Sequence, residues 1–430
     1  MSSRLGRWSI AVVIALLFLA VRMVVAYARD PFSDELFTVL LARRPFPAIL
    51  PSLLNDSGPP LYYFVARIPS VDAGRALSVV FASIPLIVLL LQKRWMPAML
   101  LAVHPAAAIL AAAARPYALC GTLIAIGILL MERDRVEGAA AAFVAAAYTH
   151  FAAAFFLPTL LFAPVLAGRH LSSVRAVRST ALAALAFLPG LVLALQQPRA
   201  ATAWMSRPTV KGVLNALAFI SDDPGPPLWV MFLAFVLTVI AIGRSWRFAP
   251  FVLIPLGLCV ALSIFRPSYF PIRFASLLAF PLVLWIADSL PRWGRATRTM
   301  LVGMLAAVGF GSILVGAITH LQRPLGDYRQ AAIVLRRNAG PNDAIVATGF
   351  LYLEVAHQFG EARVQAFPPE QAVHPGWRVP PRRQADPRSL PSGPFLWIGE
   401  RNAPELHGIR REREITLLYQ NPRALILHVR

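Results

Sequence analysis

The run WSIAVVIALLFLAVRMVVAY, residues 8–27, indicates the fold class of this chain. About 20 consecutive apolar residues are what one helix needs to cross a bilayer. The run is too long for the core of a signal peptide and has no obvious small-residue cleavage site, so we expect a retained membrane anchor. The whole chain of 430 residues is 57% hydrophobic, with a mean hydropathy of +0.62. This composition excludes an ordinary soluble globular protein.

Further apolar runs follow the first one and together predict about eleven membrane helices. They cover residues 8–27, 74–91, 95–113, 116–131, 138–149, 152–166, 179–195, 228–242, 248–265, 274–290 and 299–318. The fifth and sixth runs are short, so they could form one broken helix or a hairpin. Cys120 and Cys259 both lie inside apolar runs, so we do not expect a fold held together by disulfides.

The net charge of +20 comes mostly from arginine, and the arginines stand in short clusters between apolar runs. This is the pattern of cytoplasmic loops in a multi-pass membrane protein, and it predicts no nucleic-acid partner. With the N-terminus in the cytoplasm, every second connection is basic. These connections contain Lys93 and Arg94; Arg133 and Arg135; Arg169, Arg175 and Arg178; Arg244 and Arg247; and Arg292, Arg295 and Arg298. The other connections and the C-terminal tail are therefore expected outside the cytoplasm.

The tail differs in composition from the rest of the chain. Residues 327–338 predict an amphipathic helix, and residues 368–393, rich in proline and arginine, predict a loop. Short strands are predicted at 344–348, 363–367, 394–398, 415–419 and 424–429. The expected fold is thus a polytopic α-helical membrane protein, with a transmembrane domain at 1–320 and a small extracytoplasmic α/β domain at 321–430.

The first outward loop, residues 28–73, concentrates acidic residues in a chain with only 14% charged residues. Asp34 and Glu35 stand at the start of a predicted surface helix capped by Ser33. They could simply complement the helix dipole, or act as a general base or a metal ligand. Asp56 precedes Gly58-Pro59-Pro60, so it serves either turn chemistry or a second acid in the same cavity.

Three arginines lie at expected outer helix ends: Arg115, Arg266 and Arg273. Each alone could snorkel to lipid phosphates, but the three together with Tyr117 and Tyr269 favour binding of an anionic ligand. His150 ends the short fifth run and is either a structural hydrogen-bonding residue or a ligand-binding one. No zinc motif is present, no cofactor is assigned, and a divalent cation stays open.

Four motifs together resemble the bacterial glycosyltransferase C superfamily, and are similar to protein O-mannosyltransferases and lipid A aminoarabinose transferases. Residues 33–36 resemble the acidic motif of the first outer loop, and 56–63 resemble D-x-H-P-P-L-Y-Y, which includes Tyr62. Residues 113–119 resemble E-A-R-x-Y-A-L, and 148–151 resemble Y-T-H-Y. Weaker likenesses lie at 271–274 and 327–329. Two departures are Gly58 in place of the usual His and Ala113 in place of the usual Glu.

The resemblance implies a hexosyl- or pentosyltransferase of the bacterial inner membrane. Its donor would be a polyprenyl-phosphate sugar, and its acceptor a hydroxyl of a glycan, lipid or protein on the extracytoplasmic side. Asp34 would be the base of one inverting step, with Glu35 orienting it and Asp56 supporting the cavity. Arg115, Arg266 and Arg273 would bind the donor phosphate, and Tyr62, Tyr117, His150 and Tyr269 would bind substrate.

Two other classes fit the same composition: a transporter or flippase of lipid-linked sugars, and a non-catalytic scaffold for envelope assembly. Transporters often have two matching halves with broken helices at the membrane midplane. We find no internal symmetry in this sequence, and its polar residues gather at one face. Retention of Asp34 favours an enzyme over a scaffold, while Gly58 and Ala113 keep the scaffold open.

Overall fold

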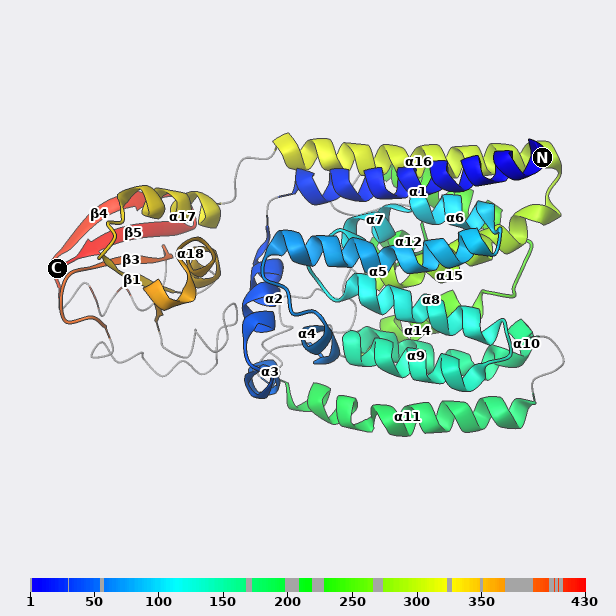
Figure 1. Cartoon of the computed structure of the whole chain (residues 1–430), viewed down its shortest axis with the longest axis horizontal. Helices are drawn as coiled ribbons and strands as arrows, with labels where there is room; N and C mark the ends of the chain where they lie inside the picture. The colour runs from blue at the N-terminus through cyan, green and yellow to red at the C-terminus, as the bar shows by residue number, and fades with distance from the viewer. Residues whose placement is uncertain are drawn as a thin grey trace. The chain divides into compact units, whose positions relative to one another are not determined.

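The computed structural model describes residues 2–29, 31–54, 58–167, 172–197, 209–218, 228–265, 274–322, 327–348, 351–367, 390–401, 406, 409 and 413–430. The chain forms two compact units (Figure 1). The first unit contains residues 1–29, 58–196 and 203–322, and the second contains 30–57, 197–202 and 323–430.

Each of the eleven predicted membrane runs is helical in the first unit. The helices are α1 (Ser2–Ala28), α5 (Val71–Leu91), α6 (Trp95–Ala102) with α7 (Pro105–Ala111), α8 (Tyr117–Met131), α9 (Val136–Thr149), η1 (Phe151–Phe162) with α10 (Ala163–Ala167), α11 (Ser173–Gln196), α13 (Leu228–Ile242), α14 (Pro250–Phe265), α15 (Ala275–Ser289) and α16 (Arg295–Gln322). Among the described residues, five helical stretches are long and apolar enough to cross a membrane, and five more apolar helices are shorter. The predicted polytopic helical fold is confirmed.

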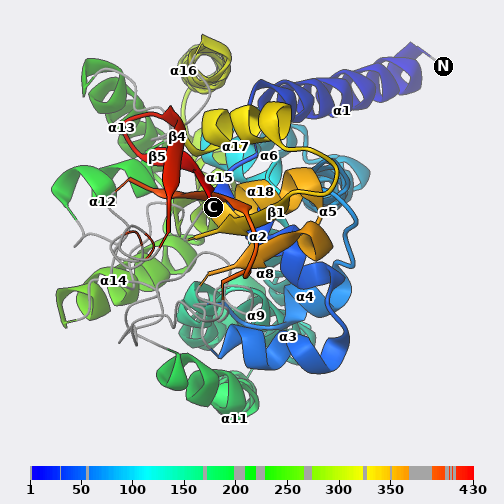
Figure 2. The same ribbon diagram turned by 90° about the vertical axis from the view of Figure 1, so that its left-hand side faces the viewer.

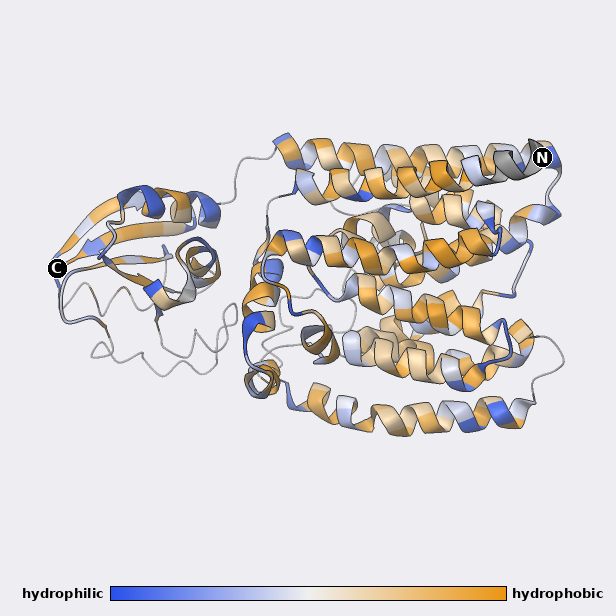
Figure 3. Ribbon diagram, in the orientation of Figure 1, coloured by the Kyte–Doolittle hydropathy of each residue, from blue (hydrophilic) through white to orange (hydrophobic). Residues whose placement is uncertain are grey.

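The helices differ in how much of their surface is covered. Within the candidate span of α15, 67% of the residues are buried, against 22% for α11. Apolar side chains such as Leu182 and Leu185 remain exposed on α11, as expected for a surface that faces lipid hydrocarbon rather than water. Figure 3 shows apolar residues along the length of these helices. Thus α15 lies in the core and α11 at the rim.

One predicted run, residues 95–113, is broken into α6 and α7. His104 and Pro105 interrupt it, and the His104 Nδ1 accepts a hydrogen bond from the Ala107 amide at 3.4 Å. The buried Arg22 of α1 donates to the carbonyls of Ala102 at 2.9 Å and Leu101 at 3.3 Å. A helix end inside a bilayer needs such partners, because no water is there to hydrogen-bond its carbonyls.

The fifth and sixth runs form a hairpin rather than one broken helix. His150 is extended, with φ −153° and ψ 120°, between the end of α9 and the start of η1. The two helices pack against each other, and α9 also packs closely against α8. At Gly127 of α8 a Cβ atom would lie 2.3 Å from the Phe143 ring of α9, so only glycine permits this approach.

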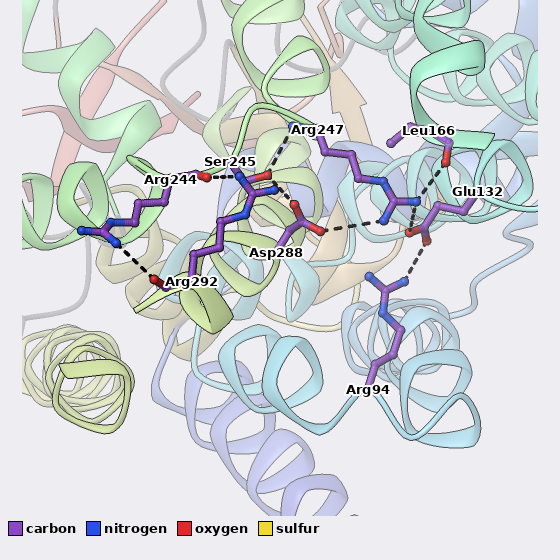
Figure 4. Close-up of polar contacts among 8 residues, drawn as sticks. All are labelled: Arg94, Glu132, Leu166, Arg244, Ser245, Arg247, Asp288 and Arg292. Carbon is purple, nitrogen blue, oxygen red and sulfur yellow. Dashed lines mark hydrogen bonds and ion pairs between the residues drawn. The ribbon is translucent and has the colours of Figure 1, made fainter. Parts of the chain in front are cut away.

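Residues of four basic connections lie together at one end of the first unit (Figure 4), and Arg175 joins the fifth connection to Glu137 at 2.5 Å. Arg94 pairs with Glu132 at 2.7 Å, which joins the connection after α5 to the one after α8. Arg247, after α13, donates to the carbonyl of Leu166 in α10 at 2.9 Å and pairs with Asp288 of α15 at 3.8 Å. The charge pattern in the sequence therefore identified connections that share one end of the bundle.

The second unit contains a five-stranded sheet in the order β2-β1-β3-β5-β4. The strands are β1 (Ala344–Ala347), β2 (Val364–Ala366), β3 (Phe395–Glu400), β4 (Ile415–Gln420) and β5 (Ala424–Val429). β1 pairs in parallel with β2 and β3, whereas β5 is antiparallel to β3 and β4. All five correspond to predicted strands. The predicted loop 368–393 lies largely outside the described residues.

Two helices accompany the sheet, α17 (Asp327–Asn338) and α18 (Leu351–Phe359), and they pack against each other (Figure 2). The predicted helix at 327–338 is confirmed, while α18 was not predicted. Asn421, in the turn between β4 and β5, donates to the carbonyl of Asp327 at 2.7 Å. This hydrogen bond ties the hairpin to the start of α17.

Part of the loop 28–73 groups with the tail, although the sequence analysis assigned this loop to the membrane domain. Helix α2 (Ser33–Arg43) packs against α18, and α3 (Phe46–Leu53) packs against α2. Gln197 donates to the carbonyl of Leu53 at 2.8 Å, which brings this residue, just after α11, into the same unit. The second unit is therefore discontinuous in sequence.

Candidate functional site

Asp34 and Glu35 occupy the first turn of α2, as predicted, but in different surroundings. Asp34 is half-buried and its carbonyl accepts a hydrogen bond from the Thr38 hydroxyl at 2.8 Å. Glu35 is fully buried, and its carboxylate accepts a hydrogen bond from the Phe32 amide at 3.4 Å. The positive end of the helix dipole lies at this first turn, so the two acidic residues stand where negative charge is favoured.

The start of α2 corrects two details of the sequence prediction. Phe32 rather than Ser33 is the N-cap, with φ −110° and ψ 161°, and Ser33 is the first helical residue. Glu35 three residues later supplies the side chain that reaches back to the Phe32 amide. All residues from Glu35 to Ala42 are buried, so α2 is covered on several sides rather than lying on a surface by one apolar face.

Arg115, Tyr117 and His150 lie in the first unit. Arg115 stands in the turn between α7 and α8, and this turn is held by the Ser78 hydroxyl, which donates to the carbonyl of Ala113 at 2.6 Å. Tyr117 opens α8, and its ring centroid lies 5.4 Å from that of His150. The structure thus brings Tyr117 and His150 together from segments 33 residues apart in the sequence.

His150 links two helices through both its backbone and its side chain. Its amide donates to the carbonyl of Ala146 at 2.8 Å, and its Nδ1 accepts from the Ala152 amide at 3.3 Å. An accepting Nδ1 leaves the proton of the neutral ring on Nε2. His150 is therefore a structural cap of η1, and its Nε2 stays the nitrogen that can donate to another group.

Tyr62 belongs to the short helix α4 (Leu61–Val65), which packs against α9. Its side chain is fully buried and meets the Tyr63 ring edge-on at 5.8 Å between centroids. Ala113, which stands where the family motif has Glu, is also buried. At this position the chain has only a methyl group where the family motif has a carboxylate.

An apolar groove of about 730 Å³ runs beside these elements in the first unit. Its walls come from α4, α9 and α11, with Glu137 near one end of α9 and Tyr148 near the other. The fourteen residues of α9 make the groove roughly 20 Å long. Small side chains open it: Ala140, Ala141, Ala145, Ala183 and Ala186 all line it.

Four predicted site residues lie outside the described residues: Asp56, Arg266, Tyr269 and Arg273. Asp34 and Glu35 belong to the second unit, while Tyr62, Arg115, Tyr117 and His150 belong to the first. Within the described part of the chain, no three His, Cys, Asp or Glu side chains gather in a way that could hold a metal ion.

Comparison with solved structures shows which known fold this chain shares. The chain aligns over 97% of its length with 97% of ArnT from Cupriavidus metallidurans bound to undecaprenyl phosphate, with a TM-score of 0.59 and 10% identity. The apo form of the same protein aligns over 96% of this chain and 97% of its own, with a TM-score of 0.58 and 11% identity. The chain has the ArnT fold. ArnT is a lipid A aminoarabinose transferase of the glycosyltransferase C fold, so the fold expected from the four motifs is confirmed. No protein-family model matches the sequence, and neither does any curated protein.

Sequence reasoning missed the buried arginines. Arg22 caps α6, and Arg75 donates to the carbonyls of Ala26 at 2.6 Å and Arg29 at 2.9 Å at the end of α1. An arginine inside or beside an apolar run is the signal that could have found them, because a charge in the bilayer needs a partner. Glu132 and Asp288, which hold arginines at the basic end of the bundle, were also not singled out.

Proposed function

We propose that this protein is a membrane glycosyltransferase that moves a sugar from a polyprenyl-phosphate carrier to an acceptor hydroxyl. The observation that carries the proposal is the ArnT fold over almost the full length of both chains, including a form of ArnT bound to undecaprenyl phosphate. The retained motif residues Asp34, Arg115, Tyr117 and His150 support it. The site would face outward from the bacterial inner membrane, with the N-terminus in the cytoplasm.

The proposed reaction is a single displacement with inversion. Asp34 takes the proton of the acceptor hydroxyl while that oxygen attacks the anomeric carbon of the sugar. The bond from the anomeric carbon to the phosphate oxygen breaks, and its electron pair leaves on the polyprenyl phosphate. The half-buried position of Asp34 in the first turn of α2 supports this role, and Glu35 would orient that turn through its hydrogen bond to Phe32.

The leaving phosphate gains charge in this step and needs cationic partners. Arg115 is the described candidate, and its turn is held in place by the Ser78 hydroxyl. Arg266 and Arg273 are proposed partners from the sequence alone. Tyr117 and the Nε2 of His150 are proposed to bind the sugar, since the two rings lie together. Tyr62 and Tyr269 are proposed to shape the same binding region, and Asp56 to support it.

The apolar groove between α9 and α11 is proposed to hold part of the isoprenoid chain. Its length of roughly 20 Å matches several isoprene units, and its walls are almost entirely hydrocarbon. Pro60, Leu61 and Phe64 line the groove, and the first two belong to the family motif at 56–63. A carrier lying there is proposed to have its phosphate toward these residues.

Mass spectrometry of envelope glycans, glycolipids and glycoproteins tests the proposal in the cell of origin. Four strains are compared: wild type, a gene deletion, Asp34→Asn, and Asp343→Asn as a control. Asp343 is an exposed turn residue of the second unit whose carboxylate accepts from the Gly340 amide at 2.8 Å. We expect one sugar to be missing from one acceptor in the deletion and in Asp34→Asn, and present in the control.

The same comparison separates the rival classes. A flippase of lipid-linked sugars would cause loss in the deletion strain, while Asp34→Asn at normal protein level would retain the modification. A scaffold would alter assembly of envelope components without removing a single sugar. Either result, with the protein confirmed in the membrane, would contradict the proposal.

A further inference from the structure

The basic end of the first unit contains a polar cavity that the proposed transfer does not use. It is lined by Gln92, Arg94, Leu129, Glu132, Arg133 and Arg247 and has a volume of about 380 Å³. Glu132 directly follows the last residue of α8, whereas Arg115 stands two residues before the first. The two residues are therefore separated by the full length of that helix, roughly 22 Å.

The carboxylates at this end position the guanidinium groups. Glu132 pairs with Arg94 at 2.7 Å through one oxygen and with Arg247 at 3.7 Å through the other. Arg247 is held further by Asp288 at 3.8 Å and by the carbonyl of Leu166 at 2.9 Å (Figure 4). Asp288 also accepts a short hydrogen bond from the Ser245 hydroxyl. Arg94 and Arg247 are thus pre-arranged around the cavity by three partners: Glu132 at the end of α8, Leu166 of α10 and Asp288 of α15.

The cavity carries an excess of positive charge. Three arginines and one glutamate line it, which leaves two positive charges, or one when Asp288 is included. Arg133 is exposed and lines the cavity, and it makes no side-chain hydrogen bond or ion pair with any residue that the structure describes. An arginine fork offers two parallel donors to a phosphate, so this residue has unused capacity toward an anion.

The backbone on both sides of the cavity is held in an uncommon conformation. Lys93 and Asp134 have φ values of 58° and 59°, in the left-handed region that normally favours glycine. Each ends a helix in the same way: the next residue, Arg94 or Arg135, donates to the carbonyl five residues earlier, at 2.8 and 2.9 Å. These helix-ending turns set the positions of Arg94 and Arg133.

We propose that this cavity binds a phosphate-bearing anion, either the headgroup of an anionic phospholipid or a free phosphate ester. Basic pockets between membrane helices are suited to phospholipid headgroups, and the volume is within the range of small-molecule sites. The binding site goes beyond the proposed transferase reaction and does not depend on it.

The test uses the full-length purified protein. Retention of phosphatidylglycerol relative to phosphatidylcholine is measured by native mass spectrometry, and inorganic phosphate is titrated in as a competitor. We expect saturable retention of phosphatidylglycerol or binding of phosphate, weakened about tenfold or more in Arg133→Gln through loss of a charge-assisted contact. Arg135→Gln, an exposed arginine two residues away that does not line the cavity, is the control and is expected to bind as the wild type.

The two probes distinguish the source of the anion. Displacement of the lipid by millimolar phosphate identifies a free-phosphate site, and retention of the lipid in its presence identifies a headgroup site. The charge reversal Arg133→Glu should abolish binding of either probe without a change in melting temperature. The proposal fails if the wild type binds neither probe, or if Arg135→Gln weakens binding as much as Arg133→Gln.

Discussion

Asp34 and Glu35 are adjacent in the sequence, yet they differ in burial and in hydrogen bonding. Glu35 is fully buried and hydrogen-bonded to the Phe32 amide at the start of α2, while Asp34 is half-buried. Sequence reasoning could identify the acidic pair because acids are rare in this chain. It could not predict their different burial, because α2 packs against elements distant in sequence, among them α18, more than 300 residues away.

This difference predicts a stability effect for Glu35. Glu35→Ala removes the carboxylate that accepts from the Phe32 amide and leaves a buried space, so the protein should lose about 1–3 kcal/mol of stability. Glu35→Gln keeps the acceptor oxygen and should lose less. Thermal unfolding of the purified protein checks both variants. Equal melting temperatures for Glu35→Ala and the wild type would contradict the structural role.

Arg22 is a second residue whose role follows from contacts distant in sequence. It donates to carbonyls of α6 about 80 residues away, and its guanidinium stacks 3.4 Å from the Phe18 ring. Arg22→Leu leaves the end of α6 without these donors inside an apolar bundle, which should cost about 2–4 kcal/mol. Arg22→Lys should retain part of the stability. A Leu variant that unfolds at the wild-type temperature would show that the break between α6 and α7 does not need this cap.

At the scale of elements, local sequence patterns were sufficient to predict most helices and strands. Hydropathy located all eleven membrane runs, and short strand-forming segments located all five strands of the sheet, because both signals depend on neighbouring residues. The break at His104 and the hairpin at His150 were harder. Each needs knowledge of what satisfies the backbone there: Arg22 in the first case, and the Nδ1 of His150 in the second.

The groove between α9 and α11 gives a prediction at this scale. Ala186→Phe should fill part of it and lower transfer from a long-chain polyprenyl donor severalfold, while transfer from a short-chain donor analogue changes less. Ala184→Phe is the matched control, since Ala184 is exposed on the same helix and does not line the groove. Equal losses for the two variants, or for the two donors, would exclude the groove as the chain-binding surface.

At the scale of the whole molecule, the tail does not stand alone. The second unit joins residues 323–430 to 30–57, so α2 with Asp34 packs against α18 of the tail. The sequence indicated the boundary near residue 320, but not this grouping, because only the three-dimensional packing brings α2 to α18.

Deletion of residues 323–430 should therefore abolish transfer to every acceptor, since α2 would lose the helix that covers it. Transfer is measured on the membrane fraction, with the amount of protein matched to wild type. A truncated protein that still transfers the sugar, with only a changed acceptor preference, would mean that the tail is an independent recognition module.

The most direct test of the central claim is sugar transfer by the purified protein. Wild type and Asp34→Asn are incubated in liposomes with a polyprenyl-phosphate sugar and an acceptor extract from the deletion strain, and release of polyprenyl phosphate is measured together with the glycosylated product. We predict stoichiometric product and carrier release for the wild type, and a rate lower by a factor of about 10²–10⁴ for Asp34→Asn at unchanged melting temperature. Full activity in Asp34→Asn would contradict the assignment of the base. Movement of the lipid-linked sugar across the bilayer without any transfer would contradict the claim that this protein is a glycosyltransferase.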